Sequence, residues 1–284
     1  MVKSQEKVIR VLKKKIGCSE PTFIIAEIGI NHNGDMKTAK KLILEAKKSG
    51  ADAIKLQTYI TEQRVPKDHA VFDILKKCEL SFKNQEELFN YSKEINIIPF
   101  STPFDEESLI FLESIECSIY KIASFDTVNH NLLSQAAKLK RPVIISTGMT
   151  NFSELKEVLN IFKNIDIALM HCVSSYPLKN TDSDLSVIKT LLNLNAGPVG
   201  YSDHSLGIEV PVLAVAAGAK LIEKHFTLNR KEKGPDHSLS ADPRTLSKLV
   251  QEIRKIEEIF GNPSLRLRKC EENARSFRRY TKKN

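Results

Sequence analysis

The chain has 284 residues, of which 41% are hydrophobic, so it can bury a large core without disulfide or metal staples. Its formal net charge is +8, but residues 1–15 carry +5 and residues 265–284 carry +6; the body between them is nearly neutral, which argues against nucleic-acid binding. Five cysteines without a CxxC pair, no membrane-length apolar run and no secretion signal predict a cytoplasmic protein with reduced thiols and no membrane association.

Short apolar runs alternate with longer amphipathic stretches along the chain. The predicted strands are 23–28, 53–56, 97–100, 119–122, 142–146, 167–171, 197–200 and 219–224. The predicted helices are 37–49, 84–95, 106–115, 130–139, 152–163, 184–193, 207–217 and 244–260. This alternation predicts an α/β protein with a (β/α)8 TIM barrel over residues 21–262. A basic N-terminal extension (1–20) and a basic C-terminal tail (263–284) would flank the barrel.

A doubly wound open sheet is the rival architecture. It is disfavoured because no glycine-rich phosphate-binding motif follows any predicted strand. The apolar runs are also continuous, as expected for strands that are buried on both faces of a parallel sheet.

Polar side chains stand at the carboxyl end of each predicted strand, where barrel enzymes have their active sites. In chain order these ends carry Glu27, Lys55, Thr102, Lys121, Ser146, His171, Ser202 and Glu223. Further polar residues follow closely behind, namely Ser124, Asp126, Ser174, Tyr176, His204 and His225. A barrel that served only as a scaffold would not need such groups at every strand end, so we expect an enzyme.

Two lysines predict an anion site. Lys55 alternates with apolar neighbours, which directs its side chain to the barrel mouth, and Lys121 lies two strands away. Nearby hydroxyls and backbone N–H groups would complete a cradle for a phosphate or a carboxylate. The alternative interpretation is that Lys55 only forms a structural ion pair with Glu27.

Two histidines predict a metal site. His204 and His225 follow neighbouring strands, about 4.8 Å apart, so both imidazoles can reach one ion. Two ligands suit a catalytic metal whose other positions take water and substrate oxygens, whereas a structural zinc site needs four ligands. Glu223 lies two residues before His225 on the same face of the strand, where it could act as a general base or orient the metal ligand. The alternative is that the histidines are ordinary buried core residues.

These segments resemble the N-terminal domain of the sialic acid synthases, the N-acetylneuraminate synthase family. The resemblance is carried, in chain order, by FIIAEIGINHNGD, AIKLQTY, FSTPFD, YKIAS, VIISTGM, HCVSSYP, GYSDH and EKHFTLNRKEKGPDH. It implies a transferase that condenses phosphoenolpyruvate with N-acetylmannosamine or a related N-acylated amino-sugar aldehyde. The product would be a nonulosonic acid, N-acetylneuraminate or a relative such as legionaminate.

The resemblance also implies roles for individual residues. The metal, manganese with magnesium or cobalt as alternatives, would be bound by His204 and His225. Phosphoenolpyruvate would contact Lys55, Thr102, Lys121, Ser124, Ser146 and Ser202. The amino sugar would contact Asp126, Ser174, Tyr176 and Asp236, with Ser174 at a position where an asparagine is common. Glu27 and Glu223 would be catalytic, and one of them would activate water.

The resemblance further implies a homodimer and a small antifreeze-like domain after the barrel. The sequence ends in a stretch that resembles the linker to this domain, so we expect the chain to lack it. Two other functions stay open at this point. One is a Schiff-base aldolase that uses Lys55 or Lys121 as its nucleophile. The other is a truncated barrel with little activity that binds a partner through its basic tail.

Overall fold

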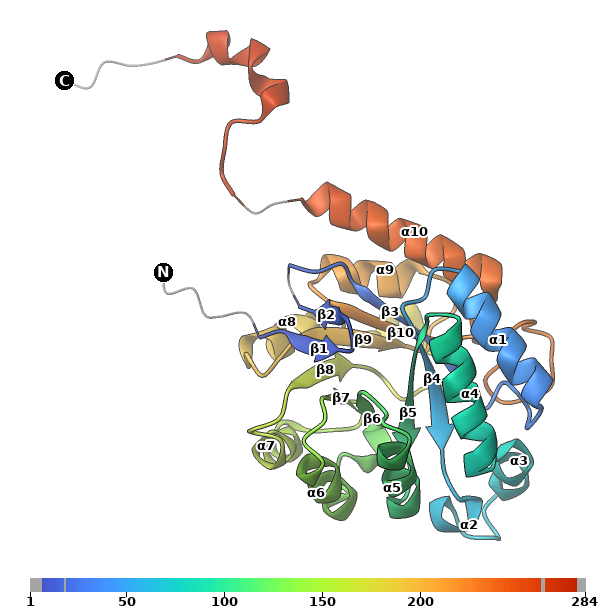
Figure 1. The fold of residues 1–284 in the computed structure, drawn as a ribbon. Coiled ribbons are helices and arrows are strands. Elements are labelled where there is room, and N and C mark those ends of the chain that lie inside the picture. The colour runs from blue at the N-terminus through green and yellow to red at the C-terminus, as the bar shows by residue number, and fades with distance from the viewer. Residues whose placement is uncertain (1–6, 18, 262–263, 280–284) are drawn as a thin grey trace.

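The computed structural model describes residues 7–17, 19–261 and 264–279, and its centre is a closed parallel barrel (Figure 1). The barrel strands are β3 (Phe23–Gly29), β4 (Ala53–Thr58), β5 (Ile98–Pro103), β6 (Tyr120–Ile122), β7 (Val143–Ser146), β8 (Ile167–His171), β9 (Val199–Asp203) and β10 (Leu221–His225). Each strand pairs in parallel with the next, and β10 pairs with β3 to close the ring. The predicted TIM barrel is confirmed.

Helices surround this barrel, and each predicted helix is present with its ends shifted by at most two residues. They are α1 (Met36–Lys48), α4 (Phe82–Glu94), α5 (Glu106–Ser114), α6 (His130–Lys138), α7 (Phe152–Ile161), α8 (Ser186–Asn193), α9 (Glu209–Ala216) and α10 (Pro243–Phe260). Many begin at a side chain that accepts a hydrogen bond from a first-turn N–H group, such as Asp35, Ser81, Asp105, Asn129, Asn151 and Asp242. These caps fix where the helices start and therefore how long the loops above the barrel are.

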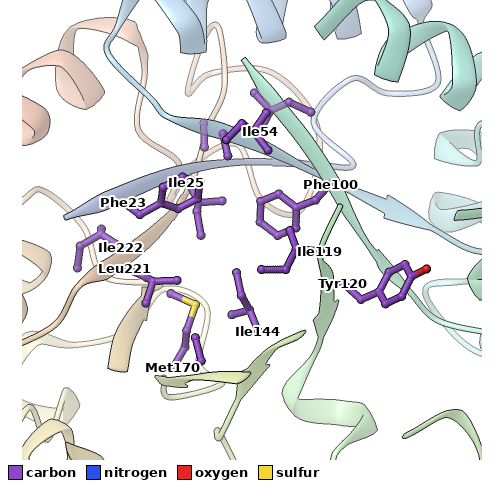
Figure 2. Close-up of a cluster of buried hydrophobic side chains, with 14 of the residues drawn as sticks. Phe23, Ile25, Ile54, Phe100, Ile119, Tyr120, Ile144, Met170, Leu221 and Ile222 are labelled. Atoms are coloured by element: carbon purple, nitrogen blue, oxygen red, sulfur yellow. The ribbon is translucent and has the colours of Figure 1, made fainter. Parts of the chain in front are cut away.

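The side chains that point into the barrel change from apolar to polar along each strand. The apolar interior of the barrel is formed by inward-pointing side chains that include Phe100, Ile119, Ile144 and Met170 (Figure 2). Two residues further along the chain, the same face carries Thr102, Lys121, Ser146 and Cys172. Side chains on one face of a strand recur at every second residue. The same inward face of a strand therefore contributes first to the packed apolar interior and then to the polar opening of the barrel.

A β-hairpin lies at the amino-terminal end of the barrel, in a segment for which we expected only a basic extension. Its strands are β1 (Ile9–Val11) and β2 (Lys14–Ile16), and they pair antiparallel. Ile9, Val11 and Ile16 are buried in the main hydrophobic core, and Lys14 forms an ion pair with Asp52 just before β4. The lysines are on the exposed face of this hairpin, so three core residues alternate with charged residues in this segment and were not recognised from the sequence.

Shorter elements complete the described structure. Helices α2 (Thr61–Arg64) and α3 (Phe72–Cys78), which were not predicted, lie beyond the carboxyl end of β4 (Figure 1). After α10 the chain forms two exposed 3-10 turns, η3 (Lys269–Glu271) and η4 (Asn273–Phe277). No helix in the described ranges is long and apolar enough to cross a membrane. The expected boundary at 262–263 and Cys18 lie outside the described residues, whereas Cys78, Cys117, Cys172 and Cys270 are free thiols.

Candidate functional site

A cavity of about 680 Å³ opens at the carboxyl ends of the barrel strands. Every predicted site residue except one lines it: Glu27, Lys55, Thr102, Lys121, Ser124, Asp126, Ser146, Tyr176, Ser202, His204, Glu223, His225 and Asp236. The exception is Ser174, whose hydroxyl oxygen is buried beside Gly148 and has no hydrogen-bond partner. The barrel therefore brings residues that are up to 209 positions apart in the sequence, Glu27 and Asp236, into one cavity.

The first group in the cavity is a buried lysine between two carboxylates. Lys55 Nζ lies 2.9 Å from Glu223 Oε1 and 3.4 Å from Glu27 Oε2, so the ion pair considered as an alternative does form. Ser202 Oγ also donates to Glu223 Oε1, at 3.0 Å. Burial raises the pKa of Glu27. Burial would also raise the pKa of Glu223, but the positive charges of Lys121 and Lys55 outweigh burial and lower the pKa of this carboxyl. The two carboxyl groups therefore have pKa values that are shifted in opposite directions.

The second group is Lys121, a buried cation whose hydrogen-bond partners are neutral. Its side chain is 2% exposed, and its Nζ donates to Ser146 Oγ at 2.6 Å and to the Ile122 carbonyl at 3.3 Å. Within the described ranges, no carboxylate lies at ion-pair distance from it. Burial lowers the pKa of Lys121, and Thr102 Oγ1 nearby in the cavity wall is buried without a hydrogen-bond partner. Such groups suit an incoming anion.

A third group lies where the loops after β6, β7 and β8 meet. Ser124, in the short helix η1 (Ser124–Asp126), accepts a hydrogen bond from the Gly148 N–H at 3.0 Å and contacts Cys172 Sγ at 3.0 Å. A Cβ atom at position 148 would come within 2.8 Å of three side chains, including that of Ser174, so only glycine allows this approach. Asp126 Oδ2 and Ser174 Oγ are both buried without a partner, which leaves them available for a polar ligand.

The two predicted metal ligands face each other across the mouth. The ring centroids of His204 and His225 are 5.6 Å apart, and the Tyr176 ring lies 4.1 Å from His204 and 6.1 Å from His225. His204 Nδ1 is 2.8 Å from the Val173 carbonyl, which can only accept, so this nitrogen carries the proton and Nε2 is free to bind a metal. His225 Nδ1 is buried without a hydrogen bond and lies 3.5 Å from Asp236 Oδ2.

The histidine pair fits a catalytic metal by its donor chemistry. Burial, above all, lowers the pKa of His204 to about 4 and that of His225 to about 3, so both are neutral imidazoles, the form that binds metals. No cluster of three or more His, Cys, Asp or Glu side chains arranged to hold a metal occurs among the residues placed by the structure. An ion held by the pair would therefore keep coordination positions for water and substrate oxygens.

The sequence analysis assigned no role to two polar residues that line the cavity, Gln57 at the end of β4 and Arg64 in α2. Gln57 Nε2 donates to Glu27 Oε1 at 3.0 Å, and Arg64 Nη1 donates to Gln57 Oε1 at 3.0 Å. The strand alternation could have indicated Gln57, because it follows Lys55 by two positions. Arg64 gave no signal, since the four-residue helix α2 is too short to show a periodic pattern.

Comparison with known proteins identifies the family of this chain. The NeuB family matches residues 42–264. An uncharacterized protein of Methanocaldococcus jannaschii is 46% identical over 89% of this chain and 76% of its own length. The N,N'-diacetyllegionaminic acid synthase of Legionella pneumophila is 40% identical over 88% of this chain and 76% of its own. The crystal structure of the N-acetylneuraminic acid (sialic acid) synthetase from Leptospira borgpetersenii, in complex with citrate, has a TM-score of 0.93 at 42% identity and 96% coverage of both chains.

Proposed function

The chain belongs to the NeuB family of nonulosonic acid synthases, and on that basis we propose that it condenses phosphoenolpyruvate with an N-acylated hexosamine aldehyde. The family assignment made from the sequence motifs is confirmed. The observation that carries the proposal is the convergence of two buried lysines, two buried carboxylates and two neutral imidazoles on one cavity. Phosphoenolpyruvate brings a phosphate and a carboxylate, and such a ligand needs several fixed cations.

We propose that Lys121 is the principal cation for phosphoenolpyruvate. It is buried next to hydroxyls and is the lysine of the pair that has no carboxylate at ion-pair distance among the described residues. Lys55 would contribute a second positive charge, with its position fixed by Glu27 and Glu223. The remaining contacts would come from the hydroxyls of Thr102, Ser124, Ser146 and Ser202, which line the same cavity.

In the proposed reaction, the methylene carbon (C3) of phosphoenolpyruvate attacks the aldehyde carbon and forms the new C–C bond, while the aldehyde oxygen gains a proton. Water then adds to C2, the carbon that carries the phosphate, and inorganic phosphate leaves by cleavage of the C2–O bond to give the keto acid. We propose Glu27 as the base that takes the proton of this water, because burial raises the pKa of its carboxyl to about 7, which suits a group that exchanges protons at neutral pH. Each of the two carboxylates keeps one oxygen without a hydrogen-bond partner, but Glu223 Oε1 accepts from both Lys55 and Ser202, so this carboxylate holds the lysine in place. Because the intermediate is cationic, its position deep in the cavity, among buried side chains, would also limit its contact with bulk water.

We further propose that His204 and His225 hold a divalent metal, manganese with magnesium or cobalt as alternatives. When bound, such an ion polarises a carbonyl oxygen as a Lewis acid. The amino sugar would then lie beside the histidines, where Tyr176 offers an aromatic face and Asp236 a carboxylate, and Asp126 would reach it from the loop after β6. Ser174 Oγ, buried beside Gly148 without a hydrogen-bond partner, would be a further contact to the sugar.

The sugar we propose is N-acetylmannosamine or a close relative, with the legionaminate precursor as the alternative. Two similar relatives have names that refer to different products, so the test must include several sugars. Phosphate release from phosphoenolpyruvate would be measured with N-acetylmannosamine and with its 6-deoxy diamino analogues, with the product mass determined in parallel. We expect one sugar to give phosphate and a nonulosonic acid in equal amounts. Absence of phosphate release with the whole series, from folded and manganese-loaded protein, would contradict the proposal.

A further inference from the structure

Arg64 lies in the cavity wall on an aromatic shelf. Its guanidinium carbon is 3.6 Å from the ring centroid of Phe104 and 4.7 Å from that of Tyr59. Tyr59 is 3% exposed, and its hydroxyl donates to the Leu75 carbonyl at 2.9 Å, so the shelf is itself fixed. Stacking holds the plane of a guanidinium and leaves its edges free to donate hydrogen bonds. The shelf therefore determines where Arg64 can donate.

A chain of two hydrogen bonds connects Arg64 to the carboxylate of Glu27. Arg64 Nη1 donates to Gln57 Oε1, and Gln57 Nε2 donates to Glu27 Oε1, each at 3.0 Å. Arginine can only donate, so it selects the amide orientation of Gln57 in which the oxygen faces Arg64. The amide NH2 group must then face Glu27. With the amide turned round, its oxygen would face the carboxylate oxygen and repel it.

The backbone makes room for this chain at Gly29. Strand β3 shifts register between Glu27 and Gly29, and Gly29 has a φ of +53°. A Cβ atom there would lie 3.1 Å from Glu27 Oε1 and 3.2 Å from Gln57 Nε2, the two atoms that form the hydrogen bond. Glycine at this irregularity therefore lets the Gln57 amide and the Glu27 carboxylate meet.

We propose that Arg64 is a positioning residue, which fixes the amide of Gln57 and through it holds the Glu27 carboxylate in its reactive orientation. The inference rests on the proposed function of Glu27 as the base. Arg64 does not act as a structural ion pair, because no carboxylate lies within ion-pair distance of it in the described part of the chain, and its hydrogen bond is to the neutral Gln57. The hydrogen bond of Arg64 therefore stabilises one orientation of the Gln57 amide, the group that contacts Glu27.

The kinetic test compares Arg64→Met and Arg64→Lys in the phosphate-release assay with phosphoenolpyruvate and N-acetylmannosamine, or whichever analogue is turned over. A misplaced catalytic group costs about 10- to 100-fold in rate, so Arg64→Met should lower kcat by that factor and change either KM by less than about twofold. Arg64→Lys keeps a donor and should recover part of the loss. Lys76→Met is the matched control, because Lys76 is an exposed cation of the same segment whose ion pairs, among the residues that the structure places, are with Glu62 and Glu79. It should match the wild type.

A double-mutant cycle shows whether Arg64 acts through Gln57. In a Gln57→Leu background, Arg64→Met should lower kcat further by less than about twofold, since the residue it orients is already gone. If instead Arg64→Met raises KM for the sugar at constant kcat, and its effect multiplies with that of Gln57→Leu, Arg64 binds the sugar directly and the proposal is overturned.

A crystal structure of the Arg64→Met variant separates this inference from the proposed function. We expect the Gln57 side chain to turn away from Glu27, so that their 3.0 Å hydrogen bond no longer forms and the carboxylate is displaced. An unchanged Gln57–Glu27 hydrogen bond would overturn the positioning role whether or not the enzyme turns over any sugar. Conversely, wild-type protein that releases no phosphate would refute the proposed reaction. The position of Gln57 in the crystal structure of the variant would then still test whether Arg64 orients this amide.

Discussion

Replacing Lys121 by methionine tests the anion site most cleanly, because the structure predicts opposite effects on binding and on stability. Lys121 is 2% exposed and interacts with Ser146 Oγ and a backbone carbonyl. A hydrogen bond between a buried cation and an anionic ligand contributes about 1.5–3 kcal/mol. Its loss should therefore raise the dissociation constant for phosphoenolpyruvate by roughly 10- to 150-fold.

The same substitution should leave the ligand-free protein at least as stable. Burial lowers the pKa of Lys121, which means that the folded state binds this proton less tightly than the unfolded state does. Methionine has a similar length and carries no charge to desolvate, so the melting temperature should not fall.

Calorimetric titration with phosphoenolpyruvate and thermal unfolding measure the two quantities, with Lys48→Met, at an exposed lysine of α1, as the control. Unchanged affinity for phosphoenolpyruvate, or a rise in KM for the sugar alone, would refute the placement of the anion site at Lys121.

Four further outcomes are expected. Lys55→Met should lower the free energy of unfolding by about 3–5 kcal/mol, because it leaves Glu27 and Glu223 buried without their counter-charge; an unchanged melting temperature would contradict this ion-pair arrangement. His225→Ala should abolish metal-dependent turnover while the circular dichroism spectrum stays native, and wild-type activity in this variant would count against the metal site. EDTA should abolish phosphate release and manganese should restore it; activity that persists in EDTA would remove the need for a metal. Borohydride with pyruvate should add no mass to the protein, whereas a trapped adduct on Lys55 or Lys121 would indicate a Schiff-base aldolase.

The barrel could be predicted because its strands are continuous apolar runs and its helices carry an apolar stripe. Strand ends were less certain: the predicted run 97–100 stops three residues before β5 does, since Ser101 and Thr102 are polar and yet buried in the cavity wall. The hairpin over 9–16 was missed for the opposite reason. Its lysines led to the prediction of a solvated extension, and only the tertiary contact with the barrel buries the apolar residues between them.

The site could be predicted as a set of strand ends, but its internal pairing could not. Strand alternation places Lys55 and Glu223 at the mouth, yet their contact at 2.9 Å depends on the closure of β10 onto β3 and on the side-chain rotamers. Ser174 shows the limit most clearly, because it follows β8 in an irregular loop, where no alternation of side chains predicts that its hydroxyl is buried beside Gly148 and does not line the cavity. Arg64 acts from a loop helix without periodicity, so only the folded chain reveals it.

A crystal structure with phosphoenolpyruvate and manganese bound is the most direct measurement. The account predicts phosphoenolpyruvate with its anionic groups within hydrogen-bond distance of Lys55 Nζ and Lys121 Nζ, and a manganese ion bound to both His204 and His225 in the same cavity. Phosphoenolpyruvate bound away from both lysines, or an ion that does not contact the two imidazoles, would contradict it.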